Sequence, residues 1–278
     1  MHTNGKHPRS TEPILLIHGL GASRHDWDIL APQLEKLGYQ TFTPDLLGHG
    51  ESFKPRDPRR YNIEQIFAHL HNWVEQQPIE SPAVFIGHSM GGFLSLLYAM
   101  RFPERVAGLV LVDPLYSPAQ LPPLAGYLQR YPQLGAKAME FAPEWLIHTV
   151  TGLDPATNKY FSRENREQIV EDYKRASPNI MYLTNTFYDL APHVSSIDIP
   201  ALILWGANDR TLLPETFPRL VSAIENGSGK AVPKAGHQPH LSHADQVNPS
   251  IIQFVETLEN SPANPPLPGR AADDAVLH

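Results

Sequence analysis

Short apolar runs alternate with helix-like segments along this chain. Six runs are apolar without the strict alternation of a half-exposed strand: residues 13–19, 39–46, 82–88, 106–114, 200–206 and 229–236. Uninterrupted apolar strands are typical of a parallel sheet that is buried on both faces. We therefore predict one strand in each run.

Helical periodicity fills several of the intervals between these runs. One helix face is predicted by spacings of three and four among Ile63, Ile66, Phe67, Leu70, Trp73 and Val74. A second face is predicted by Trp27, Leu30, Leu34 and Leu37, with Gly38 as the helix stop. A last helix is predicted to start with Asn248 as its cap and Pro249 in its first turn. Strands that alternate with helices predict an α/β fold with a mostly parallel sheet.

The region from 114 to 199 interrupts this alternation. It has no strong strand signal, several helix-like stretches, many prolines and the aromatic residues Tyr127, Tyr131, Phe141, Trp145, Phe161, Tyr173, Tyr182, Phe187 and Tyr188. We predict a helical cap inserted into a core of residues 1–113 and 200–260. Extra helical packing without a substrate role is the alternative. Residues 261–278 are rich in proline and small or polar residues, and we predict a disordered tail there.

Composition narrows the classes of function. The net charge is -7, and the 278 residues contain no long basic run, so nucleic acid is not an expected partner. The absence of cysteine excludes disulfides, cysteine nucleophiles and thiolate metal sites. The polar N-terminal segment lacks a signal-peptide core, and the apolar run 14–17 is too short to span a bilayer. We expect a soluble, cytoplasmic protein.

The motif Gly-x-Ser-x-Gly occurs once, as Gly87-His88-Ser89-Met90-Gly91. It lies where a predicted buried strand turns into a predicted helix, which is the context of a nucleophile elbow. Such a tight turn strains the serine backbone, and glycines at the flanking positions remove side chains that would clash. A helix-capping serine would explain Ser89 but not both glycines, so we predict that Ser89 is a nucleophile.

A serine nucleophile needs a base, and the chain offers 14 histidines. His237 is the best placed, because it directly follows the last predicted strand, whereas His88 should point away from Ser89. The spacing of His237, His240 and His243 is compatible with a metal site. No acidic partner at a matching spacing supports one, so we interpret these additional histidines as surface residues.

The base in turn needs an orienting carboxylate. Asp209 and Asp113 both stand at the carboxyl ends of predicted strands. We favour Asp209, because its loop neighbours the His237 loop in chain order and because Ser, Asp, His is the order of this class of hydrolase. The N–H groups of Leu20, in the loop His18-Gly19-Leu20-Gly21, and of Met90 are the predicted oxyanion hole.

The segments HGLG, PDLLGHGES, GHSMGG, GANDR and AGHQPH, in this order, resemble the α/β-hydrolase superfamily over roughly residues 13 to 259. The resemblance implies a central parallel sheet flanked by helices, a helical cap and the triad Ser89, Asp209 and His237. Small carboxylesterases are the most similar members, with carbon–carbon bond hydrolases and cofactor-free haloperoxidases as their relatives. The family usually carries two antiparallel strands before the His-Gly loop. Only about a dozen residues precede Ile14, so we expect at least one strand to be missing.

The expected function is hydrolysis of carboxylic esters with a short to medium acyl chain, through an acyl-enzyme on Ser89 and with no metal or organic cofactor. Aromatic and aliphatic residues of the insertion are expected to form an apolar pocket for a small neutral ester. Carbon–carbon bond hydrolysis and lactone hydrolysis are the alternatives on the same triad. A non-hydrolytic small-molecule receptor of the same fold is the alternative of another class.

Overall fold

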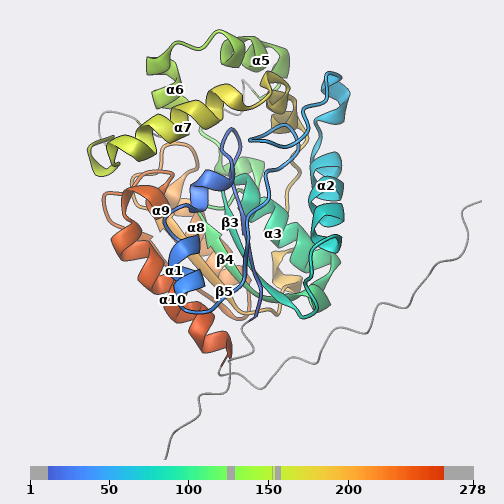
Figure 1. Cartoon of the computed structure of the whole chain (residues 1–278), viewed down its shortest axis with the longest axis vertical. Coiled ribbons are helices and arrows are strands. Elements are labelled where there is room, and N and C mark those ends of the chain that lie inside the picture. Colours follow the sequence, from blue (N-terminus) through green and yellow to red (C-terminus); the bar gives the residue numbers. More distant parts are fainter. Residues whose placement is uncertain (1–11, 124–128, 152, 154–157, 260–278) are drawn as a thin grey trace, which may run out of the picture.

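The computed structural model describes residues 12–123, 129–151, 153 and 158–259, and a six-stranded sheet lies at its centre (Figure 1). The strand order is β2-β1-β3-β4-β5-β6, and every pairing is parallel. The strands are β1 (Ile14–Ile17), β2 (Thr41–Phe42), β3 (Ala83–His88), β4 (Val106–Val112), β5 (Ala201–Gly206) and β6 (Gly227–Val232). All six predicted strands are therefore confirmed. Within the described residues no strand precedes β1, and the predicted tail 261–278 lies outside them.

Helices follow most of the strands. The α-helices are α1 (Ala31–Lys36), α2 (Ile63–Glu75), α3 (Met90–Arg101), α5 (Pro132–Glu140), α6 (Glu144–Val150), α7 (Arg163–Arg175), α8 (Phe217–Ala223), α9 (Pro239–Ser242) and α10 (Ala244–Glu259). The 3-10 helices are η1 (Arg24–Trp27), η2 (Pro58–Arg60), η3 (Pro103–Arg105), η4 (Pro118–Gln120), η5 (Asn158–Tyr160), η6 (Pro178–Asn185), η7 (Val194–Ser196) and η8 (Pro214–Thr216).

Two apolar layers bury the two faces of the sheet. Successive residues of a strand point to opposite faces, so Leu15 and Ile17 of β1 pack with α2, α3 and α8, whereas Ile14 and Leu16 pack with α1 and α10. Figure 1 shows α1 and α10 on one side of the sheet and α2 and α3 on the other. This double burial explains why β1, β3, β4 and β5 are uninterrupted apolar runs, whereas the edge strand β6 is mostly exposed.

Two helix boundaries differ from the prediction. Trp27 belongs to the 3-10 helix η1 and not to α1, and Leu37 is 47% exposed, so the predicted apolar face is split into two short helices. Pro249 lies inside α10 rather than in its first turn. The helix begins earlier because the N–H groups of Gln246 and Val247 donate to the carbonyl of His243.

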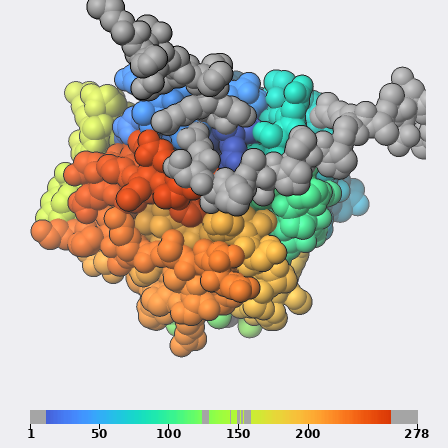
Figure 2. Space-filling model, turned by 90° about the horizontal axis from the view of Figure 1, so that it is seen from below, coloured from blue at the N-terminus to red at the C-terminus, as the bar shows by residue number. Residues whose placement is uncertain are grey.

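The described part of the segment 114–199 forms helices and no strand. Figure 1 shows α5, α6 and α7 together at one end of the molecule. Figure 2 shows the other end, where α10 in red lies beside the orange segment that includes α8 and β6. No helix of the described chain combines the length and apolarity needed to cross a membrane.

Candidate active site

Ser89 stands at the turn from β3 into α3 with φ 51° and ψ -111°, a strained conformation for a residue with a side chain. The flanking glycines are required by close approach. A Cβ on Gly91 would lie 2.0 Å from the carbonyl oxygen of Ile17, and a Cβ on Gly87 would lie 2.4 Å from that of Gly91. The turn can therefore pack against β1 and α3 only with glycine on both sides, as the sequence predicted.

A chain of hydrogen bonds joins Ser89 to the predicted base and acid. The Nε2 atom of His237 lies 3.0 Å from Ser89 Oγ, and its Nδ1 atom lies 2.8 Å from Asp209 Oδ2. The other carboxylate oxygen of Asp209 accepts from the N–H groups of Thr211 and Leu212, at 2.7 and 3.1 Å. An imidazole oriented by a carboxylate and bonded to a hydroxyl is the arrangement that activates a serine nucleophile.

Asp113, the competing acid, is buried against the same histidine. Its Oδ1 accepts from the N–H of Gly206 at 2.9 Å, and carboxylate oxygens of Asp113 and Asp209 lie with a ring nitrogen of His237 within 4.8 Å of one another. Burial raises the pKa of Asp113, and the negative charge of Asp209 raises it further. Burial alone would raise the pKa of Asp209 too, but the charge and hydrogen bond of His237 lower it. These causes favour the protonated form of Asp113 and the ionised form of Asp209.

The protonated form of Asp113 also explains how its second carboxyl oxygen can form a hydrogen bond. Its Oδ2 is buried and finds no donor among the described residues. Two ionised carboxylates cannot bond to each other, but a protonated Asp113 donates to Asp209. Asp113 has a φ of 41° at the end of β4, a second strained residue at this site.

Leu20 and Met90 both line the cavity that contains Ser89. Met90 is the first residue of α3, so its N–H has no acceptor within the helix. Within the described residues, no hydrogen bond from the Leu20 N–H occurs. The Gly19 peptide before it is held on both sides: its N–H donates to Asp26, and its carbonyl lies 2.8 Å from His18 Nδ1.

The histidines of the last loop correct one prediction. His237, His240 and His243 are only 8%, 2% and 5% exposed, so His240 and His243 are not surface residues. An acidic neighbour exists as well, because atoms of Asp26, His88 and His240 lie within 4.8 Å of one another. Sequence spacing missed it, since Asp26 is more than 200 positions away from His240.

This cluster and the Asp113–Asp209–His237 cluster are the two places in the described chain where three such side chains could surround a metal ion. In both, hydrogen bonds between the members already account for the short distances, at 3.1 Å from His88 to Asp26 and 2.8 Å from His237 to Asp209. Asp26 and His88 were not predicted as site residues, and the motif spacing alone gave no signal for their pairing.

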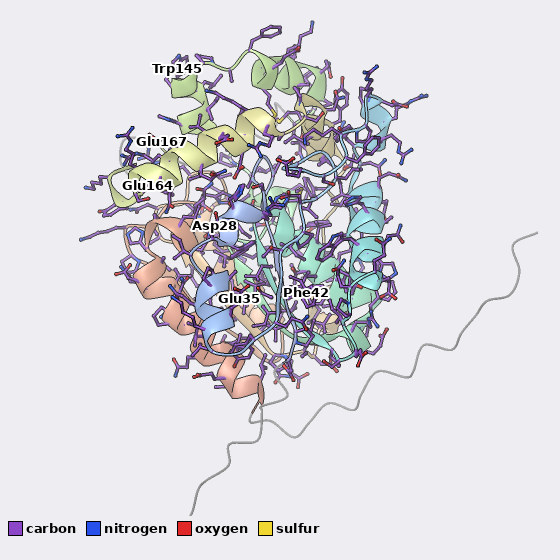
Figure 3. All side chains as sticks on the ribbon, in the orientation of Figure 1. Asp28, Glu35, Phe42, Trp145, Glu164 and Glu167 are labelled. Carbon is purple, nitrogen blue, oxygen red and sulfur yellow. The ribbon has the colours of Figure 1, made fainter. Side chains whose placement is uncertain are left out.

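A cavity of about 480 Å³ opens onto Ser89 and His237 between the sheet and α7. Its apolar lining residues are Leu20, Ile29, Met90, Leu115, Leu121, Ile169, Phe187, Leu212 and Leu241. Its acidic lining residues are Asp26, Asp28, Glu164 and Asp172, and no lysine or arginine occurs among the described lining residues. Figure 3 shows Asp28 beneath α7, whose first turn carries Glu164.

The aromatic residues of the insertion contribute less than expected. Of the nine, Phe187 alone lines the cavity among those described, and Tyr127 lies outside the described residues. Phe141 is 77% exposed and Trp145 is 68% exposed. The apolar wall is built mainly from aliphatic side chains, because the exposed aromatics lie on or next to the outer helices α5 and α6.

A network of hydrogen bonds joins α7 to the segment after β1. Ser23 Oγ, Gln168 Nε2 and Asp172 Oδ1 lie 2.8, 2.9 and 3.1 Å from Nδ1 of His25. Gln168 also donates to Asp172 at 3.0 Å. These polar contacts hold one wall of the cavity against the loop that carries Leu20.

Comparisons with known proteins agree with this fold. A family model described as the alpha/beta hydrolase fold matches residues 12–244. The chain is 30% identical over 253 residues to lipase 1 of Psychrobacter immobilis, covering 89% of this chain and 78% of that protein. It is 24% identical over 259 residues to 2-hydroxy-6-oxo-6-(2'-aminophenyl)hexa-2,4-dienoic acid hydrolase of Metapseudomonas resinovorans, covering 88% and 84%. A thermophilic esterase from Thermogutta terrifontis superimposes with a TM-score of 0.76 at 22% identity, covering 89% of this chain and 90% of that chain, and so shares the fold.

Proposed function

Because the chain belongs to the α/β-hydrolase fold family, we propose that it is a serine carboxylesterase that cleaves neutral esters of short to medium acyl chain. The observation that carries the proposal is the unbroken chain of hydrogen bonds from Asp209 through His237 to Ser89, at 2.8 and 3.0 Å. The similarity to lipase 1 supports ester hydrolysis as the reaction class.

In the proposed reaction His237 takes the proton of Ser89 as the hydroxyl oxygen attacks the ester carbonyl. The negative charge that develops on the carbonyl oxygen is bound by the N–H groups of Leu20 and Met90. Asp209 keeps the Nδ1–H tautomer of His237 and stabilises the imidazolium. His237 then protonates the leaving alcohol, and a water molecule repeats the sequence on the acyl-enzyme.

The charge of the cavity favours a neutral substrate. Four carboxyl groups line it, and the described lining residues include no lysine or arginine to bind an anion. Two of the four, Asp26 and Asp172, face histidines of the lining, which leaves Asp28 and Glu164 as the acidic groups that an anionic substrate would meet. An apolar acyl chain fits the aliphatic wall, whereas a free carboxylate elsewhere in an ester substrate would face like charges. A cavity of about 480 Å³ also suits a small ester better than a long-chain lipid.

Carbon–carbon bond hydrolysis is the second candidate, because one relative is named as a hydrolase of a hexadienoic acid. That substrate is a carboxylic acid, and the described lining residues offer its carboxylate no lysine or arginine. The histidines of the lining, His25, His88 and His237, already face carboxylates of the protein. We therefore rank this activity below ester hydrolysis. A receptor of the same fold would bind without repeated turnover.

The test is a series of p-nitrophenyl esters, from acetate to palmitate, assayed with the purified protein and with Ser89→Ala. We expect many turnovers on the short esters and a loss of several powers of ten in the variant. Turnover that survives in Ser89→Ala would contradict the proposed nucleophile. A wild-type protein that releases one equivalent and stops would favour the receptor, and cleavage of a vinylogous diketone alone would favour the second candidate.

A further inference from the structure

Asp26 and His88 form a buried pair next to Ser89 that the proposed reaction does not use. They are 5% and 2% exposed, and His88 Nδ1 lies 3.1 Å from Asp26 Oδ2. Asp26 belongs to η1, and His88 is the last residue of β3, directly before Ser89. The pair therefore joins the loop after β1 to the nucleophile elbow.

Two further hydrogen bonds extend the pair to the other catalytic loops. Asp26 Oδ2 accepts from the N–H of Gly19 at 3.1 Å. His88 Nε2 lies 2.9 Å from the carbonyl oxygen of His237. The loop of the predicted oxyanion hole, the elbow and the loop of the base are thus all bonded to the same two side chains.

The partners of His88 occupy both of its ring nitrogens. These nitrogens face a carboxylate oxygen of Asp26 and the carbonyl oxygen of His237. Burial by itself would raise the pKa of Asp26, but the neighbouring His88 lowers it well below its ordinary value, mainly through their hydrogen bond. The ionised form of Asp26 is therefore favoured inside the protein.

The contact at Gly19 is tight enough to transmit position. A Cβ at Gly19 would lie 2.9 Å from Nδ1 of His88, so the loop backbone rests directly on the imidazole. In a trans peptide the C=O and the next N–H point in opposite directions. With the Gly19 carbonyl turned toward His18 Nδ1 at 2.8 Å, the N–H of Leu20 is turned the other way.

We infer that Asp26 and His88 are positioning residues for ester hydrolysis: the hydrogen bonds of this pair hold the oxyanion loop, the nucleophile elbow and the His237 loop at fixed mutual distances. The inference rests on the proposed function for its reaction. It extends that function by assigning roles to two side chains that act on the reacting groups only through the backbone of Gly19 and His237.

Three variants test the inference: Asp26→Asn, His88→Gln and the double variant. Each single change replaces one member of the hydrogen-bonded pair and leaves its partner without its usual contact. We therefore expect kcat on p-nitrophenyl butyrate to fall about 10- to 100-fold, while KM changes less than about threefold. In the double variant two amides can replace the three hydrogen bonds. The amide oxygen at position 26 accepts from the Gly19 N–H, and the amide N–H at position 26 donates to the amide oxygen at position 88. The amide N–H at position 88 then donates to the His237 carbonyl. We expect its kcat to recover above both single variants.

His240→Met is the matched packing control. The ring of His240 is 2% exposed and packs 4.4 Å from that of His88, but neither of its nitrogens has a partner among the described residues. We expect its kcat to stay within about twofold of wild type. Thermal unfolding of all variants separates a change in stability from a change in kcat.

The rate at which a fluorescent phosphonate modifies Ser89 gives a second readout that needs no ester substrate. If no ester is turned over but Ser89 is modified, the proposed function fails and the modification rates of the variants still test the positioning role. Wild-type rates in both single variants would overturn the inference, as would no recovery in the double variant. The inference would also be overturned if EDTA abolished activity and zinc restored it. The cluster of Asp26, His88 and His240 would then bind a metal ion instead of positioning the loops through hydrogen bonds.

Discussion

Replacing Asp209 by alanine separates the two buried carboxyl groups that meet at His237. Burial raises the pKa of Asp113 most, and the negative charge of Asp209 raises it further. The variant removes the second cause, so the pKa of Asp113 falls and its ionised carboxylate becomes more populated beside the imidazole. We predict that Asp113 then takes over part of the role of Asp209 in stabilising the imidazolium.

The distances set the expected magnitude. Removal of the acid from a serine triad typically lowers kcat on the order of 10⁴-fold. Coulomb attraction scales with the inverse of distance. A carboxylate oxygen of Asp113 lies within 4.8 Å of a ring nitrogen of His237, so its charge keeps at least 2.8/4.8, or about 0.6, of the attraction that Asp209 exerts at 2.8 Å. About two of the four powers of ten should therefore be retained, so Asp209→Ala should lose about 10²-fold and Asp113→Asn/Asp209→Ala about 10⁴-fold.

The assay is kcat on p-nitrophenyl butyrate, corrected for active enzyme by titration of Ser89, with Ser89→Ala as the background. Asp113→Asn alone should stay within a few-fold of wild type, because the amide can donate to Asp209 as the protonated acid does. It should also gain stability over wild type as pH rises above 4, since the raised pKa of Asp113 makes wild-type folding less favourable as the unfolded chain ionises.

Equal rates for Asp209→Ala and the double variant would refute the proposed substitution of one carboxylate for the other. A large loss in Asp113→Asn alone would refute the assignment of the proton to Asp113.

Three further predictions concern stability and specificity. Burial lowers the pKa of His49 from 6.5 to about 3, so the free energy of unfolding should fall as pH drops between these values, by up to about 1.4 kcal/mol per pH unit. Urea midpoints at pH 7 and 5 should differ less in His49→Gln, and an equal difference would contradict the burial effect. Gly91→Ala should lose Ser89 reactivity and several degrees of melting temperature, because its Cβ would lie 2.0 Å from a backbone oxygen. Gly135→Ala is the control and should be tolerated, because its new Cβ meets the flexible end of Met181 at 2.9 Å. A p-nitrophenyl monoester of succinate should be cleaved at least about tenfold more slowly than the butyrate ester. The double variant Asp28→Asn/Glu164→Gln should reduce this difference in rate. Equal rates for the two esters in wild type would show that the charge of the cavity does not select substrates.

Much of the framework could be predicted from local sequence. Uninterrupted apolar runs marked the four central strands β1, β3, β4 and β5, because a strand covered on both faces must be apolar at every position. The paired glycines around Ser89 indicated the elbow, because a turn that approaches β1 and α3 so closely tolerates no side chain there. The order Ser89, Asp209, His237 also predicted the three groups that the structure brings together.

The tertiary structure decided what no local pattern encodes. Asp113 and Asp209 both end strands and are alike in sequence, and the bond to His237 at 2.8 Å distinguishes them. Asp26 and His88 lie 62 positions apart and meet only because η1 packs against the end of β3. Periodicity and capping are properties of neighbouring residues. The burial of His240, the pairing of His88 with Asp26 and the raised pKa of Asp113 depend instead on groups from distant segments that the folded sheet brings within a few ångströms.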